Sequence, residues 1–245
     1  MPRRRGVSQS IMPSVPPGPT IWLRADYEFP GTFSYRQPDA SAQFAIGVPI
    51  PSPATVKLAL VDTAIRWSGR INEGRRIFDL VKTLRVCVIP PCRLVKFRAF
   101  IRRLKPPHAG SKVATEESVG VRDYFLLNGP MQVYIEVPEA NAEEIKNLLH
   151  RIRRLGTSDS LCWCRDVKVK EEAPPENLCP RTFRQISTNT AGLIVQLSDL
   201  TPDSQFDGFN PFGGNSKQAH LQKNVYILPL RVVRNGETWT IYELI

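Results

Sequence analysis

The sequence has no apolar run long enough to span a membrane, and it contains only three histidines in 245 residues. A spanning helix needs about 18 to 20 consecutive apolar residues, so we do not expect the chain to cross a bilayer. Residues 1–19 carry basic residues and prolines but lack the apolar core of a secretory signal. We therefore expect a flexible arm there and a cytoplasmic protein.

Paired metal-binding cysteines are also missing. The odd number of cysteines comprises Cys87, Cys92, Cys162, Cys164 and Cys179. Their spacing contains no two C-x-x-C pairs of the kind that bind zinc. We therefore expect no metal and no cofactor, and we interpret the cysteines as small hydrophobic residues in a reducing compartment.

Positive charge is present in excess. Lys and Arg number 33 against 23 Asp and Glu, which gives a formal net charge of +10. Such a surplus favours a polyanionic partner, RNA or DNA, over an acidic small molecule. Since 42% of the residues are apolar, the chain can bury one large core or two small ones without a disulfide.

Hydrophobic periodicity predicts the order strand, helix, two strands, helix, strand. Alternation predicts the first strand in residues 20–29, and helical spacing predicts a helix from Pro53 to Trp67 with Ser52 as its N-cap. An Asp62–Arg66 pair lies four residues apart on that helix. This order predicts an α+β fold, with a ferredoxin-like (RRM-like) βαββαβ domain over residues 20–170.

The later elements complete this prediction. TLRVCVIPP and RLVKFRAFIRRL have strand character, and the polar residues that follow predict a projecting β-hairpin thumb at about residues 93–125. Asn141 and Glu144 resemble a capping box for the second helix, which we expect to end at Gly156. Residues 171–245 are predicted to form a C-terminal β-rich extension with a terminal hairpin.

Three stretches carry a resemblance to a known family: FSYRQPDASAQFAIGVPIPSPATVKLAL, VRDYFLLNGPMQVYIEV and IRRLGTSDSLCWC. In their order and spacing they resemble CRISPR-associated family five of the repeat-associated mysterious protein superfamily, nearest its archaeal-type branch. Members of this family are the Cascade subunits that hold the 5′ handle of the guide RNA. The resemblance implies a non-catalytic RNA-binding subunit of a type I surveillance complex. The partners it implies are the crRNA, target DNA near the protospacer-adjacent motif, a backbone subunit and a large subunit.

The predicted RNA-binding residues follow from charge and from this resemblance. Tyr35 and Arg36 offer a stacking ring and a charge beside the positively polarised start of a helix, which favours a phosphate. The handle contacts that the resemblance implies are Tyr35, Arg36, Ser52, Lys57, Arg98, Arg102, Arg103 and Lys105, with Arg122 and Arg154 as weaker matches. The arginines at 151, 153 and 154 form a basic helix face that either contacts RNA or is solvated surface.

Two other functions stay open at this point. A guide-processing, metal-independent endoribonuclease would need a histidine acid/base, for which His150 and His220 are the candidates, and His108 is the remaining histidine. The glycine-bearing loop FDGFNPFGGNSKQ before His220 favours this alternative. The other alternative is a basic protein-interaction module without specific affinity for RNA.

Aromatic side chains are assigned mainly to packing. We expect Phe97, Phe100, Tyr124 and Phe125 to fill the base of the thumb and Trp163 to lie in the core. If Tyr35 does not contact RNA, its ring packs locally in a surface loop.

Overall fold

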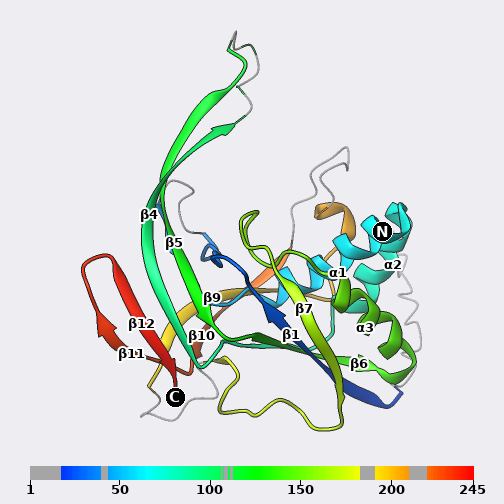
Figure 1. The fold of residues 1–245 in the computed structure, drawn as a ribbon. Coiled ribbons are helices and arrows are strands. Elements are labelled where there is room, and N and C mark those ends of the chain that lie inside the picture. The colour runs from blue at the N-terminus through cyan, green and yellow to red at the C-terminus, as the bar shows by residue number, and fades with distance from the viewer. Residues whose placement is uncertain are drawn as a thin grey trace, which may run out of the picture.

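The computed structural model describes residues 18–39, 44–105, 107, 110, 113–182, 191–209 and 220–245, without the side chains of 44, 45, 103 and 105. The predicted arm up to residue 17, His108 and most of the loop before His220 therefore lie outside the described residues. The fold is mixed α/β, with sheets that are mostly antiparallel and few helices (Figure 1).

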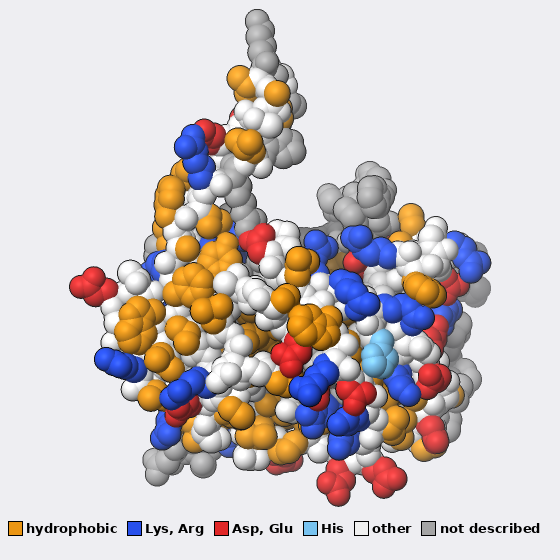
Figure 2. Space-filling model, in the orientation of Figure 1, with side chains coloured by type: hydrophobic (Ala, Val, Ile, Leu, Met, Phe, Trp, Pro, Cys, Tyr) orange, Lys and Arg blue, Asp and Glu red, His pale blue; other side chains and the backbone are white. Residues whose placement is uncertain are grey.

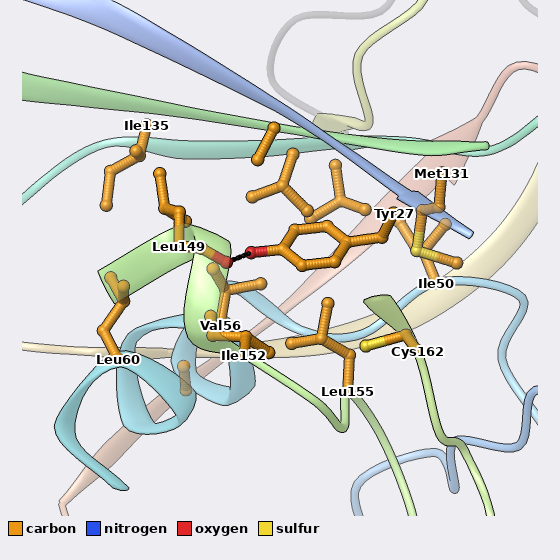
Figure 3. Packing of buried hydrophobic residues seen from close by; sticks show 14 of the residues in the cluster. Tyr27, Ile50, Val56, Leu60, Met131, Ile135, Leu149, Ile152, Leu155 and Cys162 are labelled. Atoms are coloured by element: carbon orange, nitrogen blue, oxygen red, sulfur yellow. Dashed lines mark hydrogen bonds between the residues drawn. The ribbon is translucent and has the colours of Figure 1, made fainter. Parts of the chain in front are cut away.

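A four-stranded sheet forms the body. Its strands, in the order β3-β6-β1-β7, pair antiparallel throughout. They are β1 (Thr20–Glu28), β3 (Val86–Ile89), β6 (Met131–Pro138) and β7 (Trp163–Lys170). The strand predicted in residues 20–29 is confirmed and ends at Glu28, with Leu23, Ala25 and Tyr27 fully buried on one face and Trp22 and Asp26 buried on the other. Figure 3 shows Tyr27 pointing toward the end of α3, where its hydroxyl donates a hydrogen bond of 2.8 Å to the Leu149 carbonyl.

In the described part of the chain, three α-helices accompany this sheet. They are α1 (Pro53–Ser68), α2 (Ile71–Val81) and α3 (Ala142–Arg151), the last preceded by the short 3-10 turn η1 (Glu139–Asn141). The helix predicted from Pro53 is confirmed, as is its surface ion pair between Arg66 and Asp62 at 2.8 Å. The predicted end at Gly156 is wrong, because the backbone of Ile152 is already extended.

Neither predicted side-chain cap is present. Ser52 and Asn141 occupy the N-cap positions of α1 and α3, but neither side chain bonds to its helix. The Ser52 hydroxyl instead accepts hydrogen bonds from the Tyr35 hydroxyl at 2.8 Å and from the Ser198 amide at 3.0 Å. Tertiary partners have therefore replaced the local cap at the start of α1.

The thumb is a long hairpin of β4 (Arg93–Lys105) and β5 (Glu116–Asn128), which pair antiparallel along their whole length. In Figure 1 it rises well away from the body. The terminal hairpin, β11 (Leu230–Asn235) and β12 (Trp239–Leu244), adds to the base of the thumb because β12 pairs with the Arg93–Phe97 part of β4. The short strand β2 (Phe44–Ala45) pairs in parallel with β5 on the other side.

Packing of the thumb aromatics follows this pairing. Phe125 is buried, and the Phe97 and Tyr124 rings stack with their centroids 5.8 Å apart, as predicted for a filled base. Phe100, however, is 68% exposed. Its assignment to the base is wrong because β12 ends its pairing with β4 at Phe97 and leaves the strand beyond it uncovered.

A three-stranded sheet in the C-terminal third lies against α1. Its strands, in the order β8-β10-β9, are β8 (Arg181–Thr182), β9 (Leu193–Leu200) and β10 (Leu221–Leu228). The 3-10 turn η3 (Phe206–Gly208) places Phe206 against Phe78 of α2, with ring centroids 5.9 Å apart. The predicted β-rich extension thus contributes directly to the packing of the helices.

One face of the four-stranded sheet is covered by a disulfide-linked segment. Cys87 of β3 is bonded to Cys179, which lies 92 residues further along the chain. Beside this bond, Trp22, Ile89 and Tyr134 form a small buried cluster with Leu178 packed against it. The expectation that all cysteines are reduced is therefore wrong for this pair, while Cys92, Cys162 and Cys164 are free thiols.

Trp163 is the remaining aromatic whose predicted place changes. It begins β7, which is an edge strand of the sheet, and it is 47% exposed. The prediction that it lies in the core is wrong because no further strand in the described part of the chain covers that edge.

None of the described helices combines the length and apolar character needed for a membrane crossing.

Candidate nucleic-acid interface

Three segments far apart in the sequence meet where the thumb joins the body. The Ser34 amide donates to the Ser160 hydroxyl at 2.8 Å, and that hydroxyl donates back to the Ser34 carbonyl at 2.9 Å. Phe33 and Phe125 exchange two backbone hydrogen bonds of 2.8 Å. The loop of residues 33–36, the turn of residues 156–160 and strand β5 are therefore fixed to one another.

Gly156 makes this close approach possible. Its φ of 102° lies in the region that favours glycine, and a Cβ atom there would lie only 2.7 Å from the Ser34 carbonyl oxygen. The Thr157 amide next to it donates to the same carbonyl at 2.9 Å. A larger residue at position 156 would separate the turn from the loop, so this glycine sets the distance between the segments that carry Arg154 and Arg36.

The junction gathers several of the predicted RNA-binding residues. Arg36 is the last residue of the loop, Arg122 lies on β5 and Arg154 precedes the turn. Arg36 and Arg154 are exposed, whereas Arg122 is partly buried, with its guanidinium 3.9 Å from Asp159. We call these three arginines, with the loop and turn between them, the thumb-base interface.

Tyr35 is part of the junction, but its hydroxyl points inward. It donates to Ser52 at 2.8 Å and accepts from the Thr55 hydroxyl at 3.1 Å, and the side chain is half-buried. Tyr35 therefore ties the loop to the start of α1. The partly exposed ring remains the only portion of this side chain that can meet a ligand without breaking those bonds.

The thumb arginines are paired with carboxylates. Asp123 is fully buried, and it accepts hydrogen bonds from Arg98 at 2.9 Å and from the Gly47 amide at 3.1 Å. The hydrogen bond to Asp123 raises the pKa of Arg98, whose side chain is thereby held at the thumb base. Arg102 pairs with Glu117 across the hairpin. The side chains of Arg103 and Lys105 lie outside the described residues.

Ser52 and Lys57 do not belong to this surface. Ser52 is fully buried and Lys57 is 1% exposed. The Lys57 ammonium donates to Asp199 at 2.7 Å and to the Lys82 carbonyl at 3.1 Å. Their predicted contact with RNA is therefore wrong for this structure, because β9 covers the side of α1 from which both side chains project.

Burial governs the ionisation of the Lys57–Asp199 pair. Desolvation lowers the pKa of the Lys57 ammonium and raises the pKa of the Asp199 carboxyl, in each case against the attraction of the partner. Each charge of the pair is therefore stabilised by the presence of the other, and the pair is a structural contact.

A groove adjoins the thumb-base interface on the side of the helices. It lies between the C-terminal half of α1 and residues 151–161, with a volume of about 730 Å³. Arg66, Arg151, Arg153 and Arg154 line it, together with Trp67, which is 70% exposed. Figure 2 shows Lys and Arg side chains gathered over the part of the surface that Figure 1 identifies as α1 and α3.

Trp67 is the functional candidate that sequence reasoning missed. The helical spacing from Pro53 includes Trp67 among the apolar residues of α1. However, Trp67 lies in the last turn of the helix, where its side chain does not face the core. The closely spaced arginines at 151, 153 and 154 were the signal that could have located the groove.

The outer face of the four-stranded sheet is a different kind of surface. RNA-recognition domains stack bases on aromatic residues of such a face. Here Trp22 and Tyr134 are buried, and Arg24 and Asp26 on the same face pair with each other at 2.8 Å. The aromatic rings of that face are therefore packed against protein, and the thumb base and the groove beside it are the candidate interface. Within the described ranges, no group of His, Cys, Asp and Glu side chains is placed to hold a metal ion.

Comparison with known proteins adds the following findings. No family model matches the chain. The CRISPR-associated protein Cas5 of Archaeoglobus fulgidus is 29% identical over 227 residues, which cover 91% of this chain and 98% of that protein.

Two solved structures are also similar. A CRISPR protein from Archaeoglobus fulgidus has a TM-score of 0.49 at 13% identity, and the match covers 91% of this chain and 92% of that one. A chain from a CRISPR RNA-guided surveillance complex has a TM-score of 0.42 at 18% identity, over 85% of this chain and 88% of that one.

Proposed function

We propose that this protein, a member of the CRISPR-associated Cas5 family, is the subunit of a type I surveillance complex that binds the 5′ handle of the guide RNA without cutting it. The observation that carries this proposal is sequence similarity to the Archaeoglobus Cas5 protein along nearly the whole of both chains. The net charge of +10 agrees with a polyanionic partner.

We further propose that the body is ferredoxin-like. In chain order its elements are β1, α1, β3, β6, α3 and β7, with α2 as an addition after α1. The first and third of these strands lie at the centre of the sheet and the second and fourth at its edges. This antiparallel arrangement supports the βαββαβ assignment. The division into a body over residues 20–170 and an extension over residues 171–245 stays a prediction.

The thumb-base interface suggests how RNA would be held. Exposed Arg36 and Arg154 would neutralise phosphates on either side of the loop and turn that Gly156 brings together. The buried Asp123 keeps Arg98 in place beside them. Such contacts fix the RNA backbone and carry no base specificity, which suits a complex whose sequence reading is done by guide–target pairing. The backbone subunit, the large subunit and target DNA remain the proposed further partners.

Loss of the two exposed arginines tests this placement. We expect the double variant Arg36→Gln with Arg154→Gln to bind a handle-length single-stranded RNA at least tenfold more weakly than wild type. Because each phosphate contact on a single strand contributes about 0.7 to the slope of log K against log salt, the slope should become shallower by about 1.4. Filter binding across a salt series, with the melting temperature as a folding check, measures both.

A matched control has the same change of charge elsewhere. Arg85 lies beside Trp22 on the outer face of the sheet, and Arg231 lies on β11; both are exposed. Arg85→Gln with Arg231→Gln should leave affinity within about twofold of wild type, since distant screened charges act weakly. Equal losses in the two double variants would mean that only net charge matters, and the placement would be refuted.

The two alternative functions make different predictions. An endoribonuclease that uses His150 or His220 would convert precursor RNA to a discrete product, and His220→Ala or His150→Ala would abolish that product. A protein-interaction module would bind RNA weakly and with little dependence on salt. Under our proposal the precursor stays intact and binding weakens steeply as salt rises.

A further inference from the structure

We propose that the groove between the C-terminal half of α1 and residues 151–161 binds one unpaired nucleotide of the bound RNA, with its base stacked on Trp67 and its phosphate against Arg153 and Arg154. We call it the Trp67 groove. The inference rests on the proposed RNA-binding function, and it adds a site and a mode of binding that the thumb-base interface does not include.

The size and continuity of the groove suit such a ligand. Its volume of about 730 Å³ falls within the range of roughly 300 to 1,000 Å³ typical of small-molecule sites. Arg154 and Gly156 line the groove and also belong to the segment that forms the thumb-base interface. An RNA strand held at that interface can therefore place a neighbouring nucleotide in the groove without a second binding event.

Trp67 supplies the stacking surface. Its side chain is 70% exposed, and the Arg151 guanidinium lies 4.0 Å from the ring centroid on one face. Arg151 is itself held by a 2.7 Å hydrogen bond to the Asn147 carbonyl. A ring that is backed by a cation on one face and largely exposed to solvent is a stacking platform for a base, because every base has a π-face.

The charge of the groove favours a phosphate. Four arginines and a single carboxylate, Asp62, line it, and Asp62 is already paired with Arg66 at 2.8 Å. Among the described residues, Arg151, Arg153 and Arg154 take part in no ion pair, in contrast to Arg98 and Arg102 on the thumb. Uncompensated arginines beside an exposed aromatic ring are the usual elements of a single-strand binding site.

The apolar part of the groove distinguishes a nucleotide from an acidic peptide. Leu58 and Leu161 line it beside Trp67, and Leu161 is 59% exposed. One planar ring with apolar neighbours, next to arginines, matches a base joined to a phosphate, in which the planar and the anionic parts belong to the same nucleotide. An acidic peptide would use the arginines but would leave the tryptophan without a planar partner.

The test uses the full chain and single-stranded RNA oligonucleotides that carry 2-aminopurine at one position at a time. We expect strong quenching at one position in wild type and its loss in Trp67→Ala. Trp67→Ala should also weaken RNA binding by about tenfold, and Trp67→Phe should restore most of the affinity. An abasic residue at the quenched position should weaken binding to wild type but not to Trp67→Ala, because the two changes remove the same contact.

A control for the tryptophan is Trp163→Ala, which removes another exposed indole at the start of β7. It should change neither the quenching nor the affinity. If wild type binds RNA with a steep salt dependence while Trp67→Ala binds equally well, the inference is wrong and the proposed function stands. If Trp67→Ala instead weakens association with another subunit and leaves RNA affinity unchanged, the groove is a protein-docking surface and the inference is also wrong. Absence of RNA binding by wild type would refute the proposed function first.

Discussion

Replacing Asp199 with Asn is expected to lower the free energy of unfolding by about 2 to 4 kcal/mol, somewhat less than for a fully buried ion pair, because the Lys57 side chain is 1% exposed but that of Asp199 is 30% exposed. Lys57 is 1% exposed, so its ammonium would keep only neutral oxygen acceptors, the Lys82 carbonyl and the introduced amide, and would lose the compensating negative charge. Burial lowers the pKa of Lys57 and the attraction of Asp199 raises it, so loss of the carboxylate disfavours the charged form further. Urea denaturation followed by circular dichroism measures the loss.

Two comparisons make this result specific to the buried pair. Asp62→Asn removes an exposed partner of Arg66 on the same helix, with side chains 52% and 70% exposed, and should cost less than about 1 kcal/mol. Lys57→Met combined with Asp199→Leu removes both charges and should cost less than Asp199→Asn alone. A cost for Asp199→Asn no larger than that of Asp62→Asn would contradict the structural role given to Lys57.

Reduction of the Cys87–Cys179 bond is expected to lower the free energy of unfolding by about 4 to 5 kcal/mol. The bond closes a loop of 92 residues, and the chain-entropy relation gives a stabilisation of that size for so long a loop. The double variant Cys87→Ser with Cys179→Ser should show the same loss without reductant. The measurement is denaturant unfolding of wild type and variant, each with and without a reducing agent.

The exposed free thiol supplies the control for this experiment. Cys92→Ser should leave stability unchanged with or without reductant, because Cys92 is outside the bond. Titration of the denatured, unreduced wild-type protein should detect three thiols, Cys92, Cys162 and Cys164. Detection of all five cysteines as thiols, with no effect of reductant on unfolding, would contradict the cross-link.

The elements that local patterns specify could be predicted from the sequence. Alternation in residues 20–29 and helical spacing from Pro53 placed β1 and α1 correctly to within one residue. The predicted terminal hairpin is present as well, and the sequence Arg234-Asn235-Gly236 at its end is typical of a turn. In each case the period of the apolar residues reports which face is buried, and turn residues report where the element ends.

Contacts between distant segments could not be predicted in this way. The pattern of α1 does not say that β9 covers Lys57, and the spacing of the cysteines does not reveal that Cys87 and Cys179 meet. Phe100 is exposed because the pairing of β12 with β4 ends at Phe97, opposite Trp239, which lies 142 residues further along the chain. Whether a side chain is buried depends on which distant segment packs against its face of the helix or strand. The local sequence pattern does not identify that segment.

The same holds for the candidate site, where residue types could be predicted from the sequence and contacts between distant segments could not. Arg36 and Arg154 were predicted from charge and from the family resemblance, and the segments that carry them meet because Gly156 allows the turn to touch Ser34. Lys57 has the same charge but is internal, and Arg98 is held by a buried Asp123. Trp67 became a candidate only when its exposure and its contact with Arg151 were known.

The most direct test of the central claim is chemical footprinting of guide RNA in the assembled complex, with this chain present as wild type or as Arg36→Gln with Arg154→Gln. Our account predicts that the handle nucleotides are protected by wild type, that protection weakens in the variant, and that the RNA keeps its original 5′ end. Handle nucleotides that stay fully reactive at the surface of the wild-type chain would contradict it, as would a new 5′ end generated by the chain.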